Sequence, residues 1–146
     1  MNDAPQVLIA EDDADDLVLT RRALARFRPG LQVKDFPNGV AILEYLMATP
    51  PALQPARQRP RLILLDIKMP LMGGLELLEQ LHEKRLCPGT PIVIFSSSQE
   101  PCDIARAYAA CANSFVRKPG EYTQYMDVIQ QIAAYWLDTN LSGAGP

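Results

Sequence analysis

The chain has 146 residues and a net charge of −3, with 48% hydrophobic and 21% charged residues. This size and composition fit one globular domain that buries its own core. Because there is no excess of positive charge and no long run of Lys and Arg, we expect no direct binding of nucleic acid. There is no basic segment followed by a long apolar one, and no apolar run of membrane-spanning length, so we expect a cytoplasmic protein that makes no membrane contact.

The hydrophobic pattern predicts five strands that alternate with five helices. In chain order these are a strand at Gln6–Ala10, a helix over Leu17–Arg28, a strand at Leu31–Phe36, a helix that Asn38 caps, a strand at Leu62–Leu65, a helix from Leu75 to near Cys87, a strand at Ile92–Phe95, a helix over Pro101–Cys111, a strand at Ser114–Arg117 and a helix from Tyr122 to about Asp138. Such alternation predicts an α/β fold with a parallel sheet and helices on both of its faces.

The segment Arg61–Gly74 is the centre of this pattern. Its apolar run Leu62–Leu65 does not alternate with polar residues, which is typical of a central strand covered on both faces, and Asp66 follows directly. The preceding segment, Thr49–Arg61, holds four prolines and is predicted to be a surface loop. It is long for a compact domain, and we interpret it as either a partner contact or a tolerated insertion.

Polar groups follow several predicted strands at the edge where parallel strands end. Glu11 and Asp12 follow the first strand, Asp66 the third, Ser96 the fourth and Lys118 the fifth. An isolated Asp after a strand is usually a turn former or a cap, but clustered carboxylates repel one another unless a cation is present. Mg²⁺ prefers such oxygen ligands, and a hydroxyl with a lysine suits a phosphoryl group, so Asp66 is a candidate nucleophile.

The ordered set of an acidic pair, the segment LLDIKMP with a following GG, a hydroxyl after the fourth strand and the dipeptide KP resembles the receiver domains of two-component response regulators. The resemblance spans roughly Val7 to Leu137. It implies a flavodoxin-like, doubly wound sheet with strand order 2-1-3-4-5. It also implies that residues 1–146 form a single receiver domain without an output domain.

The resemblance assigns roles around the acidic cluster. Asp66 matches the phosphoacceptor, and Glu11, Asp12 and Asp66 match the carboxylates that hold Mg²⁺. The backbone carbonyl of Lys68 matches a further metal ligand. We interpret Asp13 as a capping or solvated residue in preference to a ligand.

The resemblance also assigns the groups that respond to phosphorylation. Ser96 matches the hydroxyl that moves to the phosphoryl group, and Lys118 matches the cation that pairs with it. Phe115 stands where receivers place an aromatic switch residue. Pro119 is expected to follow a cis peptide bond.

The long loop and the end of the last helix resemble the single-domain receivers that serve bacterial phytochrome histidine kinases. This resemblance implies a sensor histidine kinase as partner, and homodimers that pair through the fourth helix, fifth strand and fifth helix. Tyr125, Tyr135, Trp136 and Leu137 are the candidates for that surface. The alternative is that these residues at helical spacing belong to the core.

The sequence disfavours two functions other than that of a signalling receiver. A phosphohydrolase of the haloacid dehalogenase type needs a second Asp two positions after its nucleophile, and Lys68 stands there. We therefore expect no true enzyme activity beyond slow loss of the chain's own phosphoryl group. A degenerate receiver that acts only as an interaction module is disfavoured by the complete acidic set.

The remaining candidates for chemistry are three cysteines and one histidine. Cys87, Cys102 and Cys111 form no Cys-x-x-Cys pair, so neither a disulfide framework nor a zinc site is predicted. We interpret them as buried or incidental thiols. His82 lies among charged residues of the third helix and is interpreted as a solvated surface residue.

Overall fold

The structure is a computed structural model and describes residues 4–142. Its strands and helices alternate as predicted: β1 (Val7–Ala10), α1 (Ala14–Phe27), β2 (Val33–Phe36), α2 (Gly39–Ala48), β3 (Leu62–Leu65), α3 (Gly74–Glu83), β4 (Ile92–Ser96), α4 (Pro101–Ala109), β5 (Ser114–Arg117) and α5 (Tyr122–Ala133). Within this described part, no helix has both the length and the apolar character that crossing a membrane requires.

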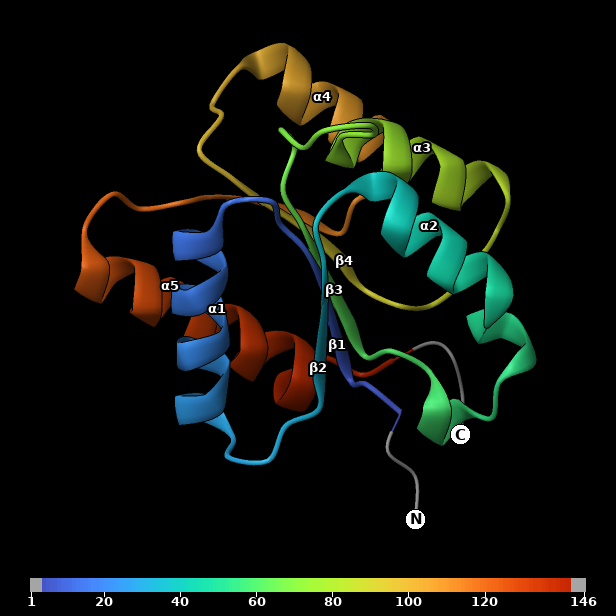
Figure 1. The fold of residues 1–146 in the computed structure, drawn as a ribbon, viewed down its shortest axis with the longest axis horizontal. Helices are drawn as coiled ribbons and strands as arrows, with labels where there is room; N and C mark the ends of the chain where they lie inside the picture. Colours follow the sequence, from blue (N-terminus) through green and yellow to red (C-terminus); the bar gives the residue numbers. More distant parts are fainter. Residues whose placement is uncertain (1–3, 143–146) are drawn as a thin grey trace.

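The five strands form one parallel sheet in the order β2-β1-β3-β4-β5, which confirms the predicted flavodoxin-like topology. Helices α1 and α5 cover one face of the sheet, and α2, α3 and α4 lie on the other (Figure 1). All strands therefore end at the same edge, from which the chain enters the next helix.

Short polar side chains fix where several helices begin. Asp13 caps α1 by accepting a hydrogen bond from the Asp16 amide at 2.9 Å, which confirms its predicted capping role and starts the helix earlier than Leu17. Asn38 caps α2 and Glu121 caps α5 in the same way. The last helix changes its winding after Ala133 and continues as a π-helix over Ala134–Thr139.

The proline-rich segment between α2 and β3 is more ordered than a plain loop. It contains two short 3₁₀ helices, Pro51–Leu53 and Ala56–Gln58, which the prediction of a loop missed. Pro51 and Pro60 are buried. Proline suits the first position of such a turn because its fixed φ matches the helix and its missing N–H is not needed there.

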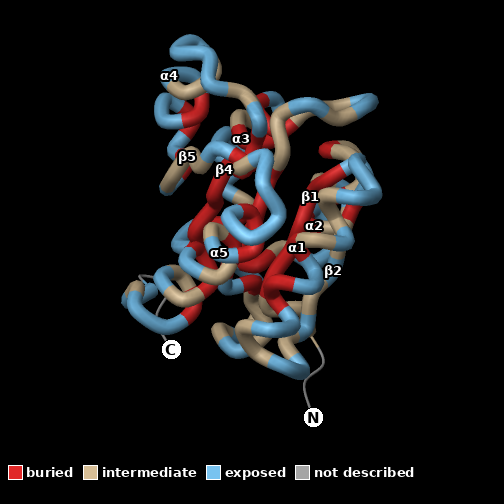
Figure 2. Tube along the Cα trace, turned by 90° about the vertical axis from the view of Figure 1, so that its left-hand side faces the viewer, coloured by how far each residue is buried: buried red, intermediate tan, exposed pale blue. Residues whose placement is uncertain are grey.

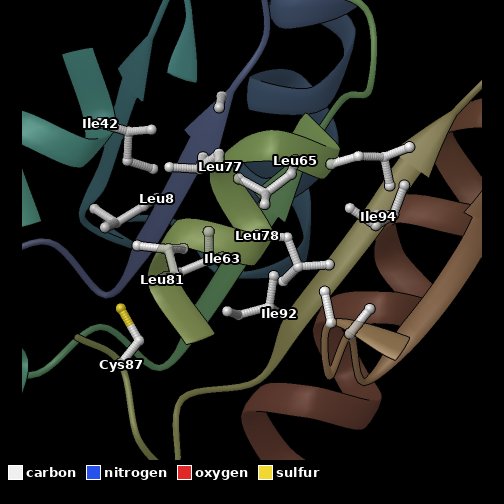
Figure 3. Packing of buried hydrophobic residues seen from close by; sticks show 14 of the residues in the cluster. Leu8, Ile42, Ile63, Leu65, Leu77, Leu78, Leu81, Cys87, Ile92 and Ile94 are labelled. Carbon is white, nitrogen blue, oxygen red and sulfur yellow. The ribbon is translucent and has the colours of Figure 1, made fainter. Parts of the chain in front are cut away.

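Two apolar cores lie on the two faces of the sheet. Buried segments follow the strands through the middle of the molecule, and exposed ones lie on the outer helices (Figure 2). Alternate residues of β1, β3 and β4 point to opposite faces, so each of these strands contributes to both cores. In the core under α3, Leu77, Leu78 and Leu81 pack over Leu8 and Ile63 of the sheet (Figure 3). This packing fixes the strand ends that carry the polar groups.

Candidate functional site

Strand register places two carboxylates side by side at the carboxyl edge of the sheet. Ala10 of β1 pairs with Leu65 of β3, so Glu11 and Asp66 leave the sheet at adjacent positions. The Asp66 amide donates a hydrogen bond to the Ala10 carbonyl at 3.0 Å, which extends the pairing to the functional residue itself. Glu11 is 5% exposed, and the Asp66 side chain is 12% exposed.

Lys118, which follows β5, reaches back across the sheet edge to these carboxylates. Its Nζ donates to Glu11 Oε1 at 2.6 Å, to Asp16 Oδ2 at 2.8 Å and to Asp66 Oδ2 at 2.9 Å. The Lys118 amide donates to the Ser96 carbonyl at 2.8 Å, which ties the lysine to the end of β4. One buried cation thus joins three carboxylates, two from the segment 11–16 and one from the end of β3.

The pKa values at this site reflect burial and excess negative charge. Burial raises the pKa of Glu11 to about 7; the hydrogen bond from Lys118 opposes this rise, and the nearby charge of Asp66 adds to it. Burial alone would lower the pKa of Lys118, but its hydrogen bonds to Asp16, Glu11 and Asp66 raise it above its ordinary value. The lysine is therefore a permanent cation, and it does not by itself neutralise the cluster.

The donor set of this cluster fits a hard divalent cation. Among the described residues, Glu11, Asp12 and Asp66 each offer a carboxylate oxygen, and these oxygens lie within 4.8 Å of one another. Mg²⁺ takes oxygen ligands and is commonly held by one or two carboxylates with water. Asp12 is exposed, so one side of the cluster is open to solvent. Lys68 lies in the exposed loop after β3, and a role for its carbonyl remains a prediction.

The loop after Asp66 returns so closely on itself that only glycine fits at its end. A Cβ atom on Gly74 would lie 2.0 Å from the Asp66 carbonyl oxygen, and one on Gly73 would lie 2.5 Å from the Ile67 carbonyl oxygen. The Gly74 amide donates to the Ile67 carbonyl at 3.0 Å. The GG pair thereby lets α3 begin directly against the backbone of Asp66, which holds that residue at the sheet edge.

The two residues predicted to respond to phosphorylation lie on neighbouring strands. Ser96 ends β4 and is buried, and its Oγ accepts a hydrogen bond from the Ser98 amide at 3.2 Å. Phe115 lies on β5, half-buried against the core under α3. Its amide donates to the Tyr108 hydroxyl of α4 at 3.1 Å. The structure thus links the predicted switch residue to α4 through Tyr108.

Two predictions from the sequence are wrong. None of the described peptide bonds is cis, so the bond before Pro119 is trans, the lower-energy form of an X–Pro bond.

Tyr125 and Leu137 are each only 3% exposed, so they belong to the core and cannot form a partner surface in this conformation. Tyr125 is fixed there by hydrogen bonds with Thr20 and the Asp16 carbonyl. Tyr135 is 49% exposed, and Trp136 is half-buried.

Asp16 is a site residue that sequence reasoning missed. It lies just before the helix predicted from Leu17 and has no assigned role there, whereas in the structure its carboxylate accepts a hydrogen bond from Lys118. The signal was the density of acidic residues, since five of the six residues from 11 to 16 carry carboxylates. Asp13 caps the helix, so Asp16 falls in the first turn, beside the strand ends.

Comparison with known proteins gives one family and several relatives. The family model described as a response regulator receiver domain matches residues 7–130. A probable methanogenesis regulatory protein, FilR2 of Methanothrix harundinacea, is 29% identical over 136 residues, which cover 93% of this chain and 86% of the relative.

Solved structures give the same fold. A structure of the phosphorylated cyanobacterial phytochrome response regulator RcpA matches with a TM-score of 0.80 and 25% identity, covering 96% of this chain and 99% of the other. The bacteriophytochrome response regulator AtBRR matches with a TM-score of 0.65 and 30% identity, covering 91% of this chain and 95% of the other.

Proposed function

The chain belongs to the response regulator receiver domain family, and from that premise we propose that it accepts a phosphoryl group on Asp66 from a histidine kinase. Receivers of this family are generally phosphoacceptor modules of two-component signalling rather than true enzymes. The observation that carries the proposal is the position of Asp66 beside Glu11, with Lys118 Nζ bound to both.

The proposed step transfers a phosphoryl group from a histidine nitrogen of the kinase to a carboxylate oxygen of Asp66. An Asp66 carboxylate oxygen attacks the phosphorus of a kinase phosphohistidine while the P–N bond breaks, and the imidazole nitrogen leaves with the electron pair and takes a proton from solvent. Glu11, Asp12 and Asp66, with the Lys68 carbonyl, would hold Mg²⁺. When bound, this cation offsets the negative charge that the phosphoryl group brings to the cluster.

The groups around Asp66 would then respond to the negative charge of the phosphoryl group. Lys118 Nζ, now 2.9 Å from Asp66 Oδ2, would pair with the phosphoryl oxygens. Ser96 would exchange its contact with the Ser98 amide for one with the phosphoryl group, and Phe115 would fill the space it leaves. The Phe115 amide donates a hydrogen bond to the Tyr108 hydroxyl, so the movement of Phe115 would be transmitted to α4.

The phytochrome pathway and the site of pairing are finer parts of the proposal. The resemblance to RcpA and AtBRR supports a phytochrome-type histidine kinase as the donor, acting with this chain in the cytoplasm. We propose homodimers through the surface of α4, β5 and α5, with the exposed Tyr135 and the half-buried Trp136 in place of the buried Tyr125 and Leu137. A receiver unit of this kind would signal through protein contacts, without binding DNA itself.

The test is the intact mass of the full chain after incubation with acetyl phosphate. One phosphoryl adduct should form with Mg²⁺ and none with EDTA. Asp66→Asn should form none under either condition, whereas Asp127→Asn, which removes an exposed carboxylate of α5, should behave as the wild type. Adduct formation by Asp66→Asn would refute the assignment. Absence of an adduct in the wild type, with Mg²⁺ binding demonstrated, would favour the interaction-module alternative.

The kinase assignment has a separate test. The chain would be mixed separately with a purified, phosphorylated phytochrome kinase and with an unrelated phosphorylated kinase. Loss of the labelled phosphoryl group from each kinase would be followed in time. Faster transfer from the phytochrome kinase is expected, and equal or slower transfer would contradict that pathway while leaving the receiver function intact.

A further inference from the structure

A ligand-sized cavity lies at the opposite end of the molecule from the carboxylates. It has a volume of about 460 Å³ and is lined by the end of α3, the entry to β4, the turn between α4 and β5, and the π-helix after α5. Small-molecule sites in proteins commonly measure about 300 to 1,000 Å³. Its walls include Arg85, Cys111, His82 and Trp136, so it offers a cation, a thiol, an imidazole and an indole ring.

The thiol and the imidazole on this wall touch each other. Cys111 Sγ lies 3.7 Å from His82 Nε2, across the gap between the α4–β5 turn and α3. Both residues are exposed. An imidazole at this distance can accept the thiol proton and stabilise the thiolate, which is the nucleophilic form of cysteine. The pair is therefore open both to solvent and to the cavity.

The other two cysteines differ from Cys111 in exposure or position. Cys87 also lines the cavity, but it is buried at the edge of the core under α3 (Figure 3), and burial raises the pKa of its thiol to about 12. It should be inert in the folded protein. Cys102 is exposed in the first turn of α4, but it does not line the cavity. Cys102 is thus an exposed thiol outside the cavity with which Cys111 can be compared.

We propose that Cys111 and His82 form a thiol-exchange site for low-molecular-weight disulfides such as glutathione disulfide. His82 takes the Cys111 proton, and the thiolate attacks one sulfur of the disulfide. A new S–S bond forms, the original S–S bond breaks, and the second thiol leaves with the electron pair and takes the proton from His82. The substituent then lies in the cavity, where Arg85 offers a cation to its carboxylates.

The first test measures rates of mixed-disulfide formation at each cysteine. The reduced full chain would be incubated with glutathione disulfide, quenched with acid, digested and mapped by mass spectrometry over time. Cys111 should react at least about tenfold faster than Cys102, and Cys87 only after unfolding. His82→Gln should bring the Cys111 rate close to that of Cys102 without changing the Cys102 rate. Lys84→Gln, an exposed change on the same segment, should alter neither.

A second probe separates thiol reactivity from binding in the cavity. Iodoacetamide is small and uncharged, so the ratio of its Cys111 and Cys102 rates reports the thiolates alone. The same ratio should be larger with glutathione disulfide. An unchanged Cys111 rate in His82→Gln, or a Cys102 rate equal to that of Cys111, would overturn the proposed site. A ratio no larger with the disulfide than with iodoacetamide would overturn the role of the cavity.

Discussion

Lys118 is the residue on which the acidic cluster depends. It is the buried cation that bonds Glu11, Asp16 and Asp66. Removing one partner of a buried charge network leaves the others uncompensated, at a cost of about 3 to 5 kcal/mol. In EDTA, Lys118→Met should lower the free energy of unfolding by about 3 kcal/mol, measured by urea denaturation.

The Lys118→Met variant should also gain more stability from Mg²⁺ than the wild type does. In this variant Mg²⁺ no longer competes with the Lys118 ammonium group for Glu11 and Asp66. The matched control is Lys84→Met, which changes an exposed lysine and should stay within about 0.5 kcal/mol of the wild type. If both variants were equally stable in EDTA, Lys118 would not hold the cluster together.

At the scale of elements, α4 is the helix held most loosely. Only Ala107 is buried within it, and it is fixed from outside by the Arg106 pair with Glu79 of α3 and by the hydrogen bond from the Phe115 amide to Tyr108. Exposed ion pairs contribute little to stability, so the hydrogen bond to Tyr108 matters most to the contact between α4 and β5. An element with few buried contacts is the one that can move at low cost.

Tyr108→Phe should therefore weaken the contact between α4 and β5 without unfolding the molecule. The loss of about 1 kcal/mol from one hydrogen bond should speed amide exchange at Phe115 about fivefold, as measured by NMR. Tyr122→Phe removes another exposed phenol, which accepts a hydrogen bond from Arg22, and should leave Phe115 unchanged. Unaltered exchange in Tyr108→Phe would show that the hydroxyl does not restrain β5.

At the scale of the whole molecule, Tyr125 joins α1 to α5 and makes stability sensitive to alkaline pH. Burial raises the pKa of its phenol to about 12, from 10.0 in the unfolded chain. Between these values the folded protein retains a proton that the unfolded chain releases, so the free energy of unfolding falls as pH rises. One tyrosine contributes a slope of at most about 1.4 kcal/mol per pH unit.

Tyr125→Phe should be less stable than the wild type at pH 8, because Thr20 loses its buried partner, and the difference should shrink between pH 10 and 12. Urea denaturation across this pH range gives the comparison. Tyr135→Phe, which changes an exposed phenol, should keep the slope of the wild type. A constant difference between Tyr125→Phe and the wild type would exclude Tyr125 as the source of the pH dependence.

The parts of the fold that sequence could predict depend on local patterns. The run Leu62–Leu65 indicated a strand covered on both faces, and all four residues are buried. Strand order and the shared polar edge followed from alternation and from the family resemblance. The gathering of Glu11, Asp12 and Asp66 then required only that parallel strands end at one edge.

The parts that sequence could not predict depend on how elements pack. Asp16 meets Lys118 because α1 begins at Ala14, close to the end of β1, and Lys118 reaches this edge from the end of β5; no spacing along the chain encodes that approach. Tyr125 and Leu137 share a helical stripe with residues that the sheet covers, and within the π-helix Leu137 is buried while Tyr135 is exposed. The Cys111 contact with His82 joins segments 29 residues apart.

The central claim is that Asp66 accepts the phosphoryl group. The most direct measurement is to treat the chain with acetyl phosphate and Mg²⁺, reduce it with sodium borohydride, which converts an aspartyl phosphate to homoserine, and map peptides by mass spectrometry. We predict homoserine at position 66 alone, and none in samples treated with EDTA. Homoserine at position 12, 13 or 16, or a phosphoryl group on Ser96 with an unchanged Asp66, would contradict this account of the site.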